Sequence, residues 1–73
     1  MTFRELREQA GFTNRGDLAN MIGVDPGTIR HLDTGHVADP RYSTVEALAT
    51  VLNTTTARVM LAIRHSVKAK EAA

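Results

Sequence analysis

Residues 18–35 read LANMIGVDPGTIRHLDTG, and this stretch decides the fold of the chain. Its first part is apolar at helical spacing and stops at Gly23, since glycine readily adopts the left-handed backbone conformation that ends helices. Asp25-Pro26 then starts a second helix, with an acidic N-cap and a proline at the first helical position. Gly35 ends that helix. Two short helices that meet at a tight turn are therefore predicted.

The second of these helices is predicted from Pro26 to Thr34, with Ile29 and Leu32 on its buried side. Two helices joined by a short turn that contains a glycine form a helix-turn-helix unit. The rest of the chain is expected to supply the core on which such a unit packs.

The composition describes one small globular domain over residues 1–73. A chain of this length buries only roughly 60% of its unfolded surface, and the hydrophobic content of 42% is enough for a core. The absence of cysteine excludes a disulfide framework and a cysteine-based zinc site. No apolar run approaches the roughly 18 residues of a membrane span, and no signal peptide is visible, so a soluble cytoplasmic protein is expected.

Further helices are predicted before the turn. Thr2 and Glu5 form a capping-box pattern, which predicts a helix over roughly residues 3–10. Thr13 or Asn14 is expected to cap the helix that leads into the turn.

Two more helices are predicted after it. Residues 36–42 are expected to form a loop, and Ser43 or Thr44 is expected to cap a helix with a clean amphipathic stripe. The stripe consists of Val45, Leu48, Ala49 and Leu52. A last helix is predicted over about residues 57–68 or a little beyond, with a frayed tail at residues 69–73. The predicted fold is therefore all-α, a compact five-helix bundle that contains a helix-turn-helix.

The net charge of +1 is low for a protein that binds nucleic acid. The position of charge matters more than its sum, because a small basic face can guide binding locally. Arg15, Arg30 and Arg41 lie in or beside the central unit. Charge alone therefore neither establishes nor excludes a nucleic-acid partner.

Three segments carry a family resemblance: LREQAGFT at residues 6–13, DLANMIGVDPGTIRHLDTG at residues 17–35 and LATVLNTT at residues 48–55. They resemble the phage-repressor and Cro type of helix-turn-helix domain, the XRE family, over roughly residues 3–63. The resemblance implies a lambda-repressor-like DNA-binding domain, whose second motif helix enters the major groove while the first crosses the DNA backbone. It also implies that the protein works in a bacterial cell or a phage-infected one.

The resemblance places the base-reading positions at the start and on the outer side of the second motif helix. These positions are Pro26, Gly27, Thr28, Arg30 and His31. The first two offer base edges no side-chain donor or acceptor, so readout is expected to rest on the last three. Arg30 is the natural bidentate partner for guanine.

Contacts to the DNA backbone are implied at the start of the first motif helix and in the loop after the second. The corresponding residues are Asn14, Arg15, His36, Arg41, Tyr42 and Ser43. The resemblance also implies an ion pair between Arg7 and Asp33 that orients the recognition helix.

The last helix has one apolar residue off its buried face. At about 100° per residue, Leu61 projects on the side that it shares with Arg64 and His65. Because the family often dimerises through its C-terminal elements, these three residues are candidates for a weak homodimer surface, which forms through the last helix or on DNA.

The leading functional interpretation is a sequence-specific double-stranded DNA-binding transcriptional regulator, Cro-like or a small repressor, that occupies an operator. The alternative is a protein-interaction module on the same fold, such as an antitoxin or antirepressor, which the near-neutral charge and Pro26-Gly27 favour. No paired carboxylates, activated nucleophile or phosphate-cradling glycine loop point to an enzyme. No cofactor, metal, small-molecule ligand or membrane partner is expected, and the histidine spacings fit no usual metal site.

Overall fold

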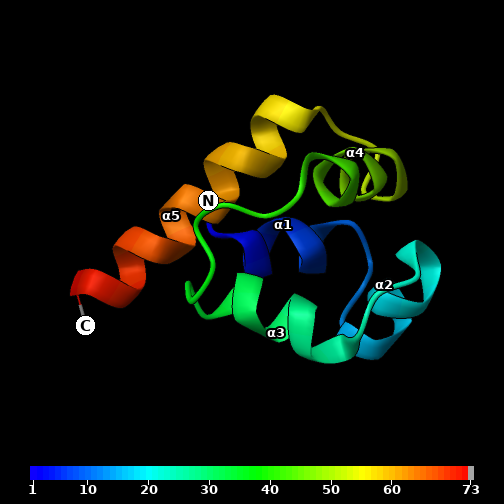
Figure 1. Cartoon of the computed structure of the whole chain (residues 1–73), viewed down its shortest axis with the longest axis horizontal. Coiled ribbons are helices and arrows are strands. Elements are labelled where there is room, and N and C mark those ends of the chain that lie inside the picture. The colour runs from blue at the N-terminus through cyan, green and yellow to red at the C-terminus, as the bar shows by residue number, and fades with distance from the viewer. Residues whose placement is uncertain (73) are drawn as a thin grey trace.

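A computed structural model describes residues 1–72, and these residues form five helices and no strand. The helices are α1 (Phe3–Gln9), α2 (Arg15–Ile22), α3 (Pro26–Asp33), α4 (Tyr42–Val51) and α5 (Thr56–Ala72). Figure 1 shows α1 in the middle of the bundle, where it contacts both α3 and α5, whereas α2 packs on α3 and α4. The predicted all-α five-helix bundle is confirmed.

The capping box predicted for α1 is present. The backbone N–H of Thr2 donates to Glu5 Oε1 at 2.9 Å, and the N–H of Glu5 donates to Thr2 Oγ1 at 3.3 Å. These two bonds satisfy donors that the first turn of a helix leaves without partners. Hydrogen bonds from the backbone and then the hydroxyl of Thr2 lower the pKa of Glu5 below its ordinary value.

The turn between α2 and α3 matches the prediction at Gly23 but departs from it at Asp25. Gly23 takes the left-handed conformation, with φ +74°. Asp25 is the N-cap of α3, but its side chain accepts no capping hydrogen bond, so the predicted side-chain cap is wrong. The Thr28 N–H bonds instead to the backbone oxygen of Asp25 at 2.9 Å, and Pro26 has no N–H to offer.

The start of α4 also differs from prediction. The N-cap is Arg41 rather than Ser43 or Thr44, and it makes no side-chain capping bond. The Val45 N–H donates to the Arg41 backbone oxygen at 3.1 Å, so the helix begins at Tyr42 and incorporates both predicted cap residues. The hydroxyl residues that could cap the helix therefore lie inside its first turn.

The last helix is longer than predicted. It starts after Thr55, whose Oγ1 accepts from the Arg58 N–H at 3.1 Å, and continues to Ala72. The helix continues beyond residue 68 because the following residues, mostly alanine and lysine, are good helix formers. Residues 69–72 of the predicted frayed tail are thus helical, and Ala73 lies outside the described residues.

The core lies where the helices converge and includes the predicted stripe of α4. Its buried apolar residues are Phe3, Leu18, Ala19, Ile29, Leu32, Val45, Leu48, Ala49, Leu52, Val59, Ala62 and Ile63. Two polar residues, Arg7 and Ser66, are buried with them. Ser66 Oγ accepts from the Phe3 N–H at 2.9 Å, which joins the start of α1 to α5. The outer side of α3 stays free of the core.

Candidate nucleic-acid interface

The outer side of α3 exposes most of the residues predicted to read DNA bases. Arg30 and His31 are exposed, because Ile29 and Leu32 occupy the buried side of the same helix. Pro26 is also exposed. The remaining two predicted readers, Gly27 and Thr28, are half-buried. The helix thus presents its two basic side chains outward.

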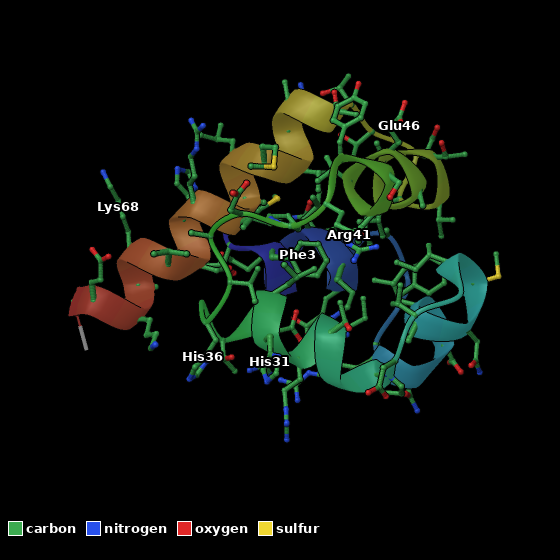
Figure 2. The ribbon with its side chains drawn as sticks, in the orientation of Figure 1. Phe3, His31, His36, Arg41, Glu46 and Lys68 are labelled. Carbon is green, nitrogen blue, oxygen red and sulfur yellow. The ribbon has the colours of Figure 1, made fainter. Side chains whose placement is uncertain are left out.

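Two histidines lie together at the end of this helix, and Figure 2 shows them on the same edge of the molecule. The rings of His31 and His36 have centroids 5.9 Å apart. The Thr34 hydroxyl donates to the backbone oxygen of Arg30 at 2.9 Å, and its oxygen lies 2.7 Å from His36 Nδ1. This contact engages Nδ1 of His36 and leaves its Nε2 edge for an outside partner.

Surface hollows on both sides of α3 bring predicted contact residues together. One hollow is lined by Arg15, Asp25, Pro26, Gly27 and Arg30. Another lies between α3 and α4 and is lined by Val24, Thr28, Leu32, Val37, Pro40, Arg41 and Thr44. The structure therefore groups predicted backbone residues with predicted base readers. Tyr42 and Ser43 are exposed at the start of α4 but line neither hollow.

Asn14 has a structural role in addition to its predicted contact with the DNA backbone. Its Oδ1 accepts from the Gly16 N–H at 2.7 Å and caps α2. Since the carbonyl oxygen of the amide is used, the side-chain NH₂ remains as the donor for an outside acceptor.

A buried carboxylate ties α1, α2 and α3 together behind the interface. Asp33 Oδ2 lies 3.0 Å from Arg7 Nη2 and 2.6 Å from Arg15 Nε. The Arg7 and Asp33 side chains are 3% and 1% exposed, whereas that of Arg15 is 37% exposed. The ion pair implied between Arg7 and Asp33 is present. Sequence analysis missed the third member, because no local pattern relates Arg15 to a residue 18 positions later.

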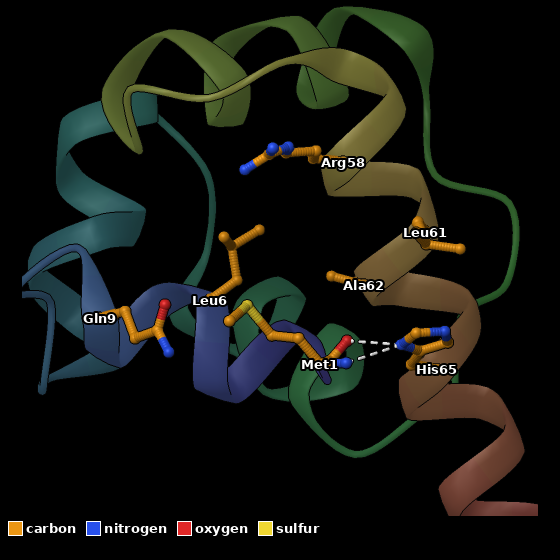
Figure 3. Close-up of a pocket in the computed structure, with 7 residues that line it drawn as sticks. All are labelled: Met1, Leu6, Gln9, Arg58, Leu61, Ala62 and His65. Atoms are coloured by element: carbon orange, nitrogen blue, oxygen red, sulfur yellow. Dashed lines mark hydrogen bonds between the residues drawn. The ribbon is translucent and has the colours of Figure 1, made fainter.

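The surface suggested for dimerisation forms a shallow groove between α1 and α5, shown in Figure 3. It is lined by Met1, Leu6, Gln9, Arg58, Leu61, Ala62 and His65. Leu61 is 53% exposed, and His65 Nδ1 lies 2.8 Å from the Met1 amine and 2.9 Å from its carbonyl oxygen. Arg64 is exposed but does not line the groove.

In residues 1–72, no three histidine, cysteine, aspartate or glutamate side chains come together as metal ligands would. None of its helices has the length and apolar character needed to cross a membrane.

Comparison with known proteins gives one family. A helix-turn-helix domain family matches residues 1–61, which include α1 to α4 and the beginning of α5. No curated protein and no solved structure matches the sequence. The match covers most of the chain and includes the α2–α3 unit, whose turn and exposed second helix have the geometry of the motif. The chain therefore belongs to the helix-turn-helix domain family, whose members are typically DNA-binding regulators.

Proposed function

We propose that the protein binds double-stranded DNA sequence-specifically, as a small transcriptional regulator of the phage-repressor and Cro type. The observation that carries this proposal is the outer face of α3, where Arg30 and His31 are exposed while Ile29 and Leu32 anchor the helix in the core. An exposed, firmly anchored second helix is the element that such motifs insert into the major groove. Occupying an operator would exclude the polymerase without any cofactor.

Base readout in this proposal is concentrated on the middle of α3. Arg30 donates two hydrogen bonds to a guanine, which is the commonest specific contact of arginine. His31 and Thr28 read neighbouring bases or their methyl groups. Pro26 and Gly27 allow the start of the helix to approach the bases closely without adding donors.

Backbone contacts come from both ends of the interface. The NH₂ group of Asn14 and the outer edge of Arg15 face phosphate at the start of α2, and the exposed His36 ring adds a contact after α3. Arg41, Tyr42 and Ser43 would add contacts from the start of α4. Phosphate contacts of this kind set the position of the protein on the duplex and carry no sequence information directly.

A weak homodimer is proposed through α5 or on DNA. Leu61 and the groove beside it offer an exposed apolar surface at a distance from α3. Two copies joined there would contact two half-sites of a palindromic operator, as dimeric helix-turn-helix proteins do.

The second candidate function is a protein-interaction module, such as an antitoxin or antirepressor. The net charge of +1 and the lack of donors at Pro26-Gly27 favour it. Salt dependence separates the two functions, because binding through phosphates weakens steeply as salt rises.

The deciding experiment is a selection from randomised double-stranded DNA with the purified protein, run at two salt concentrations. A DNA-binding regulator enriches a defined site, and its affinity falls with salt. Enrichment of no sequence, together with no salt-dependent affinity for any duplex, would overturn the proposed DNA-binding function.

A further inference from the structure

The two arginines that share Asp33 use their donors differently. Arg7 places Nε and Nη2 on the Asp33 carboxylate and Nη1 on the backbone oxygen of Phe12, so each of its three nitrogens is bonded. Arg15 places only Nε on Asp33, and its two Nη groups make no hydrogen bond within residues 1–72. All three nitrogens of the Arg7 guanidinium are therefore engaged, while that of Arg15 has a free edge.

The free edge of Arg15 lies on the surface. Its side chain is 37% exposed and lines two surface hollows, one beside Arg4 and Asn14 and the other beside Arg30. The guanidinium is a rigid planar fork, so a bond at Nε fixes the direction in which the Nη edge points. The Asp33 side chain is 1% exposed and is itself held by Arg7, so it provides a fixed anchor for that bond.

We propose that Asp33 is a positioning residue for phosphate binding, which acts through Arg15. The carboxylate holds Arg15 Nε so that the Nη edge is aimed at a phosphodiester of the DNA backbone at the start of α2. A side chain that is ordered in advance loses less conformational entropy when the ligand binds. The inference rests on the proposed DNA-binding function and assigns an anionic residue a favourable role in binding an anion.

Loss of the Asp33 carboxylate should change DNA affinity in the direction opposite to the one that net charge predicts. Replacing Asp33 with Asn raises the net charge from +1 to +2, and bulk electrostatics alone would then tighten binding to any duplex. The matched control is Asp39→Asn, which makes the same charge change at an exposed residue for which the structure shows no ion pair within residues 1–72. We expect Asp33→Asn to weaken binding to random duplex DNA by about tenfold, and Asp39→Asn to leave it unchanged or to tighten it.

A double-mutant cycle separates positioning from loss of structure. In a chain that already carries Arg15→Met, which keeps the Arg7–Asp33 pair, Asp33→Asn should cost little further affinity because the residue that it positions is gone. Equal losses in both backgrounds would overturn the inference, as would tighter binding by Asp33→Asn in the wild-type background. Circular dichroism at the binding temperature checks that each variant is folded.

Arg15→Lys keeps the inference testable if Asp33→Asn does not fold, since Arg7 is left buried without its partner. Lysine retains the charge but cannot hold Asp33 and phosphate with two edges of one rigid group. We expect Arg15→Lys to bind random duplex about fivefold more weakly than wild type, and wild-type affinity would overturn the inference. If the wild-type chain shows no salt-dependent binding to any duplex, the proposed function fails; if it binds and only the variants disagree, this inference alone fails.

Discussion

Gly35, at the end of α3, lies directly against the backbone of Ser66 in α5. A Cβ at Gly35 would be 2.8 Å from the carbonyl carbon of Ser66 and 3.0 Å from Cα of Val67. The residue also has φ +77°, a conformation that residues with a Cβ rarely adopt. This contact fixes where α5 crosses the end of α3.

Gly35→Ala should therefore destabilise the fold strongly. Backbone strain and overlap with backbone atoms, which cannot move aside cheaply, together predict a loss of at least about 3 kcal/mol. The control is Gly23→Ala, where φ is +74° but no atom lies within 4 Å of the added Cβ. It should cost only about 1–2 kcal/mol. Urea unfolding measures both, and equal losses would contradict the role assigned to the Ser66 contact.

Ser66→Ala should remove the acceptor of the Phe3 N–H at a fully buried position. An unsatisfied buried N–H costs about 1–3 kcal/mol, which should appear in the free energy of unfolding. Ser43→Ala, at an exposed site, should stay within about 0.5 kcal/mol of wild type. If both serines behave alike, the bond from Phe3 does not stabilise the packing of α1 on α5.

Arg30→Ala should weaken binding to the selected DNA site by about 1–3 kcal/mol and relax the preference at one base pair. Lys68→Ala, which removes one exposed positive charge from α5, is the matched control and should leave the base preference unchanged. Fluorescence anisotropy on a panel of single-base variants measures both properties. A uniform loss across the panel would show that Arg30 contacts phosphate instead of a base.

Leu61→Asp should abolish self-association without unfolding the protein, because the side chain is exposed and a buried charge at an interface is costly. Met21→Asp places the same charge on the exposed side of α2 and should leave association unchanged. Sedimentation with and without a palindromic duplex reports the oligomeric state. A wild-type protein that is monomeric in both conditions would rule out the dimer.

Glu5→Gln should make the free energy of unfolding less dependent on pH in the acidic range. Since the pKa of Glu5 is lowered in the folded state, ionisation of this carboxyl stabilises the fold above its ordinary value of 4.5. That stabilisation is lost as pH falls through the lower folded value. Thermal unfolding from about pH 7 to about pH 3 should therefore show wild type above Glu5→Gln at neutral pH and the difference shrinking in acid. A difference that is constant over this range would argue against an ionic role for Glu5.

Local signals were sufficient to predict most of the helices. The capping box at Thr2 and Glu5, the glycine at 23 and the apolar stripe of α4 depend on backbone bonds and periodicities within a few residues. Such features depend only on residues that are close in sequence, so they can be predicted without knowledge of the tertiary packing. The same reading failed at Arg41, where a residue without capping chemistry begins α4.

Features that depend on distant residues were set by packing. Arg15 and Asp33 are 18 positions apart in sequence, and Gly35 and Ser66 are 31 positions apart. No local sequence pattern therefore predicts either contact. The amino-acid sequence specified which segments are helical and which side of each is apolar. The assembled core then brought three helices to one carboxylate, because burying an aspartate requires cationic partners and only the packed bundle supplies them.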